Sequence, residues 1–145
     1  MPSTARRGGR LRPDAVINEL TDLPDDPAQI SATGHRNIRI RREGTGNLLA
    51  ATAALPGARR PFLVQSVAWD LPGGAAVAAA EQERALLEFG GVVLRYGQFY
   101  GPGTYGESEV PPPPRIHIDE AARRTVTALG AESGAVIAVV DPGAA

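Results

Sequence analysis

The chain has 145 residues, of which 43% are hydrophobic and 21% charged, and these values fit one soluble globular domain with a real core. All 15 basic residues are arginine and cysteine is absent, which excludes a catalytic lysine, a thiolate nucleophile and a cysteine-based zinc site. The formal net charge of -1 gives no field that attracts nucleic acid, and no apolar run reaches the roughly 18 residues of a membrane span. We therefore expect a cytoplasmic protein without metal, nucleic-acid or membrane partners.

The N-terminal part of the chain predicts a tail, a strand and a helix. We expect residues 1–13 to be a flexible arginine-rich tail ahead of one domain, residues 14–145. Asp14–Leu20 is typical of a short buried strand, and a turn-prone segment follows it. A helix is expected from Asn37 to about Leu55, because apolar residues and threonines recur there at helical spacing and a Pro-Gly pair then stops it.

Strands and helices continue to alternate through the rest of the chain. The expected elements are strands at Pro61–Val67, Val92–Tyr96 and Ala135–Val140 and helices at Ala75–Phe89 and Glu120–Leu129, with a spacer at Pro111–Pro114. Strands that alternate with helices of this length predict a parallel sheet built from right-handed crossovers. The fold class is therefore α/β, with helices on both faces of the sheet.

The stretch Gly91–Thr104 is the most informative part of the sequence, because a buried apolar strand runs directly into an aromatic and glycine-rich turn. Open parallel sheets bind ligands at the carboxyl ends of their strands, so the residues after this strand are expected to line a crevice. Gly101–Gly106 matches the spacing G-x-G-x-x-G, but a dinucleotide motif must open a helix, and Pro111–Pro114 prevents a helix there. We therefore predict that these glycines do not form a phosphate loop.

Several segments resemble the signatures of one enzyme family, in the right order. Leu94–Gly103 is similar to the pattern Leu-Arg-x-x-x-x-Tyr-Gly-Pro-Gly of the extended short-chain dehydrogenases, also called the NAD-dependent epimerase/dehydratase family. The further matches are the helix segment Glu43–Ala51, the strand Phe62–Trp69 that contains a serine, the helix entry Arg115–Ala122 and the closing strand Gly134–Asp141. Together they cover about Asp14 to Asp141, and they resemble the C-terminal half of the family.

The resemblance implies a Rossmann-like fold, NAD or NADP as cofactor and a small-molecule substrate, either sugar-like or another hydroxy or keto compound. It assigns a catalytic role to Ser66, which matches the family's serine by position. The cofactor-binding residues that it implies are Leu20, Thr21, Gln65, Tyr96 and Gly97, and the substrate-binding residues are Gln98, Tyr100 and Arg115. It implies no metal ligand.

Two parts of the family's machinery have no counterpart in the sequence. The family's tyrosine-lysine pair is missing, because Asp70–Val77 contains no tyrosine where one is expected and the chain contains no lysine. Only 13 residues precede Asp14, against about 30 for a βαβ unit, so the glycine-rich cofactor loop is missing as well. We therefore expect a partial domain that lacks the first strands of the fold.

Two functional hypotheses remain open on these grounds. The first is a truncated or degenerate NAD(P)-dependent oxidoreductase that binds cofactor weakly or not at all by itself. The second is a noncatalytic α/β module whose exposed sheet edge pairs with another chain or a second copy. For single residues, Asp119 is expected to cap the Glu120–Leu129 helix, His117 to be a hydrogen-bonded strand residue, and Arg115 either to bind an anionic group or to be solvated.

Overall fold

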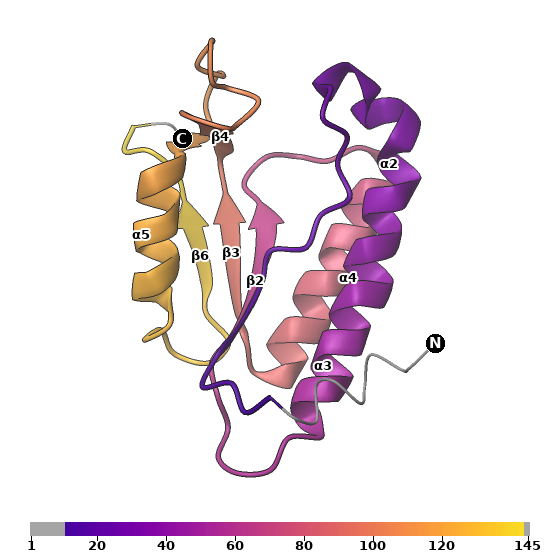
Figure 1. Cartoon of the computed structure of the whole chain (residues 1–145), viewed down its shortest axis with the longest axis vertical. Helices are drawn as coiled ribbons and strands as arrows, with labels where there is room; N and C mark the ends of the chain where they lie inside the picture. Colours follow the sequence, from indigo (N-terminus) through magenta and orange to yellow (C-terminus); the bar gives the residue numbers. More distant parts are fainter. Residues whose placement is uncertain (1–10, 144–145) are drawn as a thin grey trace.

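A parallel four-stranded sheet lies between helices on both of its faces in the computed structural model, which describes residues 11–143 (Figure 1). The strand order is β1-β2-β3-β6, and the strands are β1 (Val16–Asn18), β2 (Phe62–Val67), β3 (Val92–Tyr96) and β6 (Val136–Val139). The predicted α/β fold with a parallel sheet is therefore confirmed. The tail predicted at residues 1–13 lies, apart from its last three residues, outside the described part of the chain.

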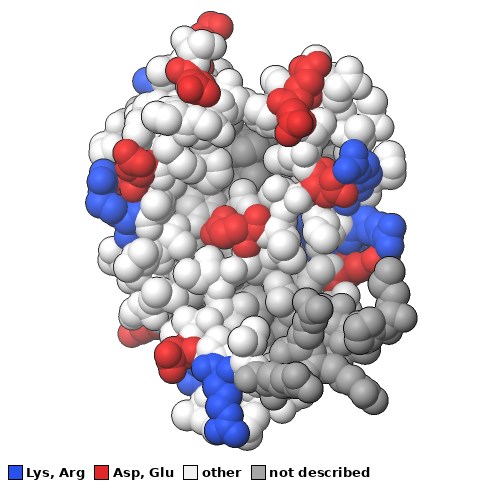
Figure 2. Space-filling view, in the orientation of Figure 1, with Lys and Arg blue, Asp and Glu red and all other residues white. Residues whose placement is uncertain are grey.

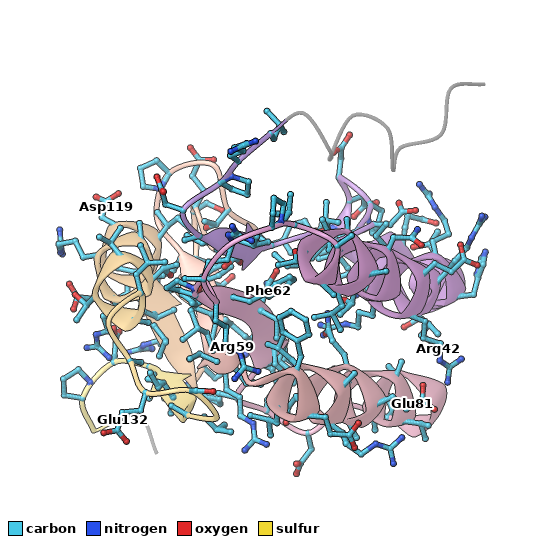
Figure 3. The ribbon with its side chains drawn as sticks, turned by 90° about the horizontal axis from the view of Figure 1, so that it is seen from below. Arg42, Arg59, Phe62, Glu81, Asp119 and Glu132 are labelled. Atoms are coloured by element: carbon cyan, nitrogen blue, oxygen red, sulfur yellow. The ribbon has the colours of Figure 1, made fainter. Side chains whose placement is uncertain are left out.

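One face of the sheet is covered by two long helical rods and the other by a single helix, as Figure 3 shows in projection. The first rod is continuous and consists of α2, the π-helical segment η2 and α3; the second rod is α4, and α5 covers the opposite face. Their bounds are α2 (Ile30–Arg39), η2 (Ile40–Gly44), α3 (Thr45–Ala53), α4 (Gly73–Phe89) and α5 (Ile118–Ala128). None of the described helices combines the length and the apolar character that crossing a membrane requires.

The core is divided by the sheet into two apolar clusters, because successive side chains of a strand point to opposite faces. Leu63 and Leu94 are fully buried in the cluster under α5, whereas Val64 and Val93 are fully buried in the cluster under α3 and α4. Burying side chains of this size contributes about 1.5–3 kcal/mol each relative to exposure. This alternation also fixes which way the polar residues of the strands point.

The first helical rod begins much earlier than the sequence predicted. Helix is expected from Asn37, but the chain is already helical from Ile30, directly after the 3-10 turn η1 (Pro27–Gln29). The signal for the 3-10 turn that leads into this helix is Asp26, whose Oδ1 accepts a hydrogen bond of 2.9 Å from the Ala28 N–H. An aspartate cap followed by proline is a common way to begin a helix.

The start of α5 also differs from the prediction. The helix begins at Ile118, so Asp119 lies inside its first turn and the expected capping role of Asp119 is wrong. The cap is His117, whose Nδ1 accepts a hydrogen bond of 3.2 Å from the Asp119 N–H. The strand position expected for His117 is confirmed, because it ends β5 (Arg115–His117).

A second sheet, which the sequence did not predict, extends the molecule beyond the end of β3. It is a parallel pair of β5 and β4 (Gln98–Tyr100), with Gln98 opposite Arg115 and Tyr100 opposite His117. Gly97 connects β3 to this pair, and a Cβ atom at Gly97 would lie 2.6 Å from the Arg115 backbone. Only glycine permits this close approach, and the approach places Arg115 beside the carboxyl end of the main sheet.

Candidate active site at the carboxyl edge of the sheet

The three residues predicted to bind substrate lie together on the small sheet. Gln98 and Arg115 are paired in register, and Tyr100 is two residues further along the same strand as Gln98. All three side chains are half-buried. The segment that follows β6 joins them, because the Asp141 N–H donates to the Arg115 carbonyl over 2.8 Å. The elements therefore bring the predicted substrate residues to one place at the edge where ligands bind in parallel sheets.

Tyr100 is fixed from two sides. Its hydroxyl donates a hydrogen bond of 2.7 Å to Asp141 Oδ2, and its ring packs edge-to-face on His117 at 5.2 Å between centroids. The bond to Asp141 raises the pKa of Tyr100 above its ordinary value. Tyr100 is therefore a neutral hydrogen-bond donor near neutral pH.

Arg115 and Gln98 both contact the proline segment. Arg115 Nη1 donates to the Pro111 carbonyl over 3.0 Å, and Gln98 Nε2 donates to the Pro112 carbonyl over 3.4 Å. These bonds orient the guanidinium and the amide while the side chains keep some contact with solvent. A planar arginine in such a position can bind a carboxylate or phosphate through paired hydrogen bonds.

Ser66, the residue predicted to be catalytic, lies on the opposite side of β3 from this group and is buried at 1% exposure. Its hydroxyl donates a hydrogen bond of 2.6 Å to Glu83 Oε1 of α4. Arg95, the register partner of Ser66 on β3, donates to both oxygens of Glu83, at 3.1 Å from Nε and 2.6 Å from Nη2. The serine hydroxyl thus has a partner within the protein, and its catalytic role stays a prediction.

The Glu83 carboxylate is held in its charged form by these donors. Burial by itself would raise the pKa of Glu83, but the hydrogen bonds from Arg95 and Ser66 and the charges of Arg95 and Arg41 outweigh it, so the pKa lies below the ordinary value. An ion pair that is partly buried and doubly hydrogen-bonded is well ordered. The three side chains of Ser66, Glu83 and Arg95 therefore join α4 to β2 and β3.

Tyr96 points to the other face of the sheet, toward α5. It is 2% exposed, and its hydroxyl lies 2.9 Å from Glu19 Oε1 and 2.5 Å from Thr125 Oγ1. Glu19 is exposed as a residue, yet its carboxyl end is desolvated where it meets Tyr96; this raises its pKa, although the bond from Tyr96 opposes the effect. Desolvation also raises the pKa of Tyr96, so the tyrosine is neutral and donates to Glu19.

The remaining residues predicted to bind cofactor are spread along the edge. Leu20 and Thr21 follow β1 and are exposed, and the Leu20 N–H donates to Asn18 Oδ1 over 3.1 Å. Gln65 lies on β2 and is half-buried, on the same face as Leu63, whereas Gly97 is buried against Arg115. The edge therefore carries these four residues, but Ser66 and Tyr96 point to opposite faces of the sheet.

Three acidic residues of this region were not predicted from the sequence. Glu19 follows β1 directly and Asp141 lies two residues after the end of β6, and a polar residue just after a strand is a usable signal in a parallel sheet. Glu83 gives a weaker signal, because it belongs to a helix face that also carries Ala79 and Leu86, which are buried. Glu83 comes within hydrogen-bond distance of Ser66 only in the folded chain.

Within residues 11–143, the carboxyl edge contains no loop that could bind the phosphates of a nucleotide. Gly101 and Gly103 have positive φ angles of 105° and 77°, and Tyr100 and Gly106 form an isolated bridge, so the glycines make a closed turn and no helix follows. The prediction from the proline run is confirmed. Within the described residues, these glycines therefore provide no helix N-terminus that could hold a pyrophosphate. Those residues also contain no cluster of acidic or histidine side chains that could hold a metal ion.

Two hollows of the surface lie away from the carboxyl edge. A hollow of about 220 Å³ lies at the amino end of the sheet and is lined in part by Thr52, Arg59 and Phe89, and one of about 190 Å³ lies between α3 and α4. Neither contains a residue of the carboxyl edge. Both of these hollows therefore lie apart from the candidate site.

Known proteins were compared with this architecture. No model of a known protein family matches the chain. A 3-diazoavenalumate denitrifying reductase from Streptomyces sp. is 33% identical over 90% of this chain, which spans 56% of that reductase. A solved dTDP-glucose 4,6-dehydratase double mutant from Streptomyces venezuelae, with NAD bound, has a TM-score of 0.69 at 14% identity over 93% of this chain and 53% of its own.

A second solved structure agrees with the first. A UDP-glucuronic acid 4-epimerase from Bacillus cereus, in complex with UDP-glucuronic acid and NAD, has a TM-score of 0.65 at 18% identity over 88% of this chain and 54% of its own. The fold is thus that of part of the Rossmann-like fold of these two solved structures. The resemblance to the extended short-chain dehydrogenase family is confirmed, and the chain spans about half the length of the relatives that it matches.

Proposed function

We propose that the chain forms the substrate side of an NAD(P)-dependent oxidoreductase that acts on a small molecule. The observation that carries this proposal is the grouping of Gln98, Tyr100 and Arg115 on the β4–β5 pair, at the carboxyl edge of a parallel sheet. The kinship with NAD-dependent enzymes supports the cofactor. The cytoplasmic location that the sequence predicts is compatible with such a role.

In this proposal each residue of the group has a positioning task. Arg115 binds an anionic group of the substrate, and Gln98 hydrogen-bonds a neighbouring polar atom. Tyr100, whose one hydroxyl proton is donated to Asp141, accepts a hydrogen bond from a substrate hydroxyl. The cofactor, when bound, supplies or accepts a hydride at the substrate carbon.

The missing proton-transfer pair favours including a substrate whose reduction needs a hydride but no proton. Reduction of a ketone needs both a hydride and a proton for the new hydroxyl, and the family's tyrosine-lysine pair, which moves that proton, has no counterpart here. Replacing an aromatic diazonium group by hydride needs no such proton, because the hydride forms the new C–H bond while dinitrogen leaves with the C–N bond electrons. The kinship with a diazo-compound reductase supports this class beside the hydroxy and keto compounds.

A chimera tests the proposal. The part of the Streptomyces reductase that this chain does not cover would be joined ahead of Asp14, and NADPH oxidation would be followed with an aryl diazonium carboxylate and with a keto sugar. The proposal expects oxidation with one of the two, reduced at least about tenfold in Arg115→Ala, which corresponds to 1.4 kcal/mol of lost binding. A chimera that binds NADPH but oxidises it with neither compound would refute the proposed reaction.

The second function, a noncatalytic interaction module, has its own supporting observation. β1 is an edge strand, and Ile17 on it is 41% exposed, so the sheet has an apolar edge at this end. A homodimer or a partner chain would cover it. Pairing through this edge is compatible with the oxidoreductase proposal, so the two functions need not compete.

A further inference from the structure

The first helical rod carries four arginines, and three of them are paired with carboxylates at the surface. The pairs, with nitrogen–oxygen distances of 2.6 to 2.9 Å, are Arg36–Asp22, Arg39–Glu43 and Arg42–Glu81. Figure 2 shows arginine and acidic side chains next to each other on the flank formed by α2. Arg41 is the exception, because it is only 7% exposed and forms no salt bridge with a described carboxylate.

The buried guanidinium of Arg41 is held by a neutral amide. Its Nη1 donates to Gln82 Oε1 over 2.9 Å, and Gln82 Nε2 donates to Thr45 Oγ1 over 2.7 Å. These bonds fix the direction of the guanidinium but bring no negative charge to it. Desolvation lowers the pKa of Arg41, and the charge of Glu83, which accepts no hydrogen bond from Arg41, offsets this only in part. A buried charge with so little compensation is costly unless another group supplies it.

The other donors of Arg41 face a hollow. Its Nε and Nη2 form no hydrogen bond with another described residue, and no described side-chain nitrogen or oxygen that is closed off from solvent lacks a partner. The two donors therefore reach accessible space. That space is the hollow of about 190 Å³ between α3 and α4, which is lined in part by Arg41, Thr45, Gly46 and Gln82. Arg41 belongs to the π-helical segment η2, and such segments are frequent at functional sites.

The size and the charge of this hollow favour a small anion. Its volume lies below the roughly 300 Å³ at which pockets for larger organic ligands begin. In Figure 3, Arg42 and Glu81 extend toward each other from the two rods, so this part of the wall has no net charge and Arg41 leaves the hollow positive. Nε and Nη2 lie on one edge of a guanidinium, and Arg95 uses the same two atoms to bind both oxygens of Glu83.

We propose that the hollow between α3 and α4 binds a small oxyanion, either a phosphate or a short carboxylate, through Nε and Nη2 of Arg41. The anion supplies the negative charge that the guanidinium lacks, and the bond to Gln82 holds the guanidinium ready for it. No residue of the carboxyl edge lines this hollow, so the inference does not depend on the proposed function.

Calorimetric titration of the full 145-residue chain with inorganic phosphate and with succinate, at constant ionic strength, tests this inference. We expect saturable binding at one site with at least one probe. Arg41→Met removes the charge and should weaken binding at least tenfold. Gly46→Leu should do the same without touching Arg41, because a Cβ at Gly46 has nothing within 4 Å and the new side chain enters the hollow. Gly34→Leu, at an equally open position of the same rod outside the hollow, is the matched control and leaves binding unchanged.

Each outcome decides for or against the site. No saturable binding of either probe, or binding that Gly46→Leu retains, overturns it, and an equal loss in Gly34→Leu overturns its place in this hollow. A dimer of the chain that binds neither probe and that Arg41→Met dissociates overturns it as well, because an acidic side chain of a second copy then occupies the hollow. Binding of only one probe supports the site and identifies its ligand as a phosphate or a carboxylate. Circular dichroism verifies the fold of Arg41→Met, and Gly46→Leu decides where that variant does not fold.

Discussion

Replacing Ser66 by alanine distinguishes a structural serine from a catalytic one. The hydroxyl is buried at 1% exposure and donates to a charged carboxylate over 2.6 Å. A hydrogen bond to a charged partner contributes about 1.5–3 kcal/mol to stability. Because Arg95 still donates to both oxygens of Glu83 in the variant, we expect the lower end of this range.

The stability loss of Ser66→Ala depends on pH, since the serine stabilises the charged form of Glu83. The pKa of Glu83 in the folded protein is depressed below its ordinary 4.5, so its stabilisation is complete above that value and is lost as the pH falls through the folded pKa. The variant has lost one donor, and its folded pKa moves up toward the ordinary value. The difference between wild type and variant is therefore full at pH 7 and shrinks below about pH 4.

Urea unfolding at pH 7 and at pH 3.5 measures the loss of stability and its dependence on pH. In thermal unfolding at pH 7, the melting temperature of the variant should be about 5 °C lower. The matched control is Thr127→Ala, which removes an exposed hydroxyl bonded to a backbone carbonyl and should change stability by about 0.5 kcal/mol or less. If Ser66→Ala is as stable as wild type at pH 7, the bond to Glu83 does not contribute to stability, and the structural role of the serine is refuted.

Three further substitutions test other parts of the account. Gly97→Ala should lower the free energy of unfolding in urea by about 1–3 kcal/mol, because its Cβ would lie 2.6 Å from the Arg115 backbone. The control Gly34→Ala, whose Cβ would have nothing within 4 Å, should raise it by up to about 1 kcal/mol. Equal effects of the two substitutions would contradict the close approach. Tyr96→Phe should cost about 1–2 kcal/mol, since it leaves Glu19 and Thr125 without their shared partner; an unchanged midpoint would contradict that cluster. Glu19→Gln should stabilise the chain by about 0.5 kcal/mol or less at pH 7 and not at pH 4. The pKa of Glu19 is raised in the folded protein, so its charged form destabilises the fold above that pKa. Destabilisation at pH 7 would show that Glu19 is better paired than we infer.

The alternating order of strands and helices could be predicted, because each long element carries its own local pattern. Val92–Tyr96 is recognisable from its apolar run alone, and the stop after Phe89 from the glycine pair. The helix start at Ile30 was also encoded locally, by Asp26 and Pro27, but those residues were interpreted as a turn. Both signals consist of the same residue types, and only the continuation of the helix distinguishes them.

The candidate site was harder to predict, because its contacts join distant segments. Gln98 and Arg115 pair across the proline segment, and a strand of three residues has too little pattern to be recognised by itself. The direction of a strand side chain depends on which face the neighbouring helices cover, so Ser66 and Tyr96 could be placed on their strands but not on opposite faces. Their partners, Glu83 and Glu19, become visible only in the folded chain.

Titration of the purified 145-residue chain with NADH and NADPH, followed by nicotinamide fluorescence, tests the central claim most directly. The account holds that these 145 residues provide the nicotinamide and substrate side of a site and contain no phosphate loop of their own. It predicts no saturable change with either nucleotide for these residues alone, and saturable binding in the chimera with the Streptomyces reductase. Tight saturable binding by the chain alone would contradict it.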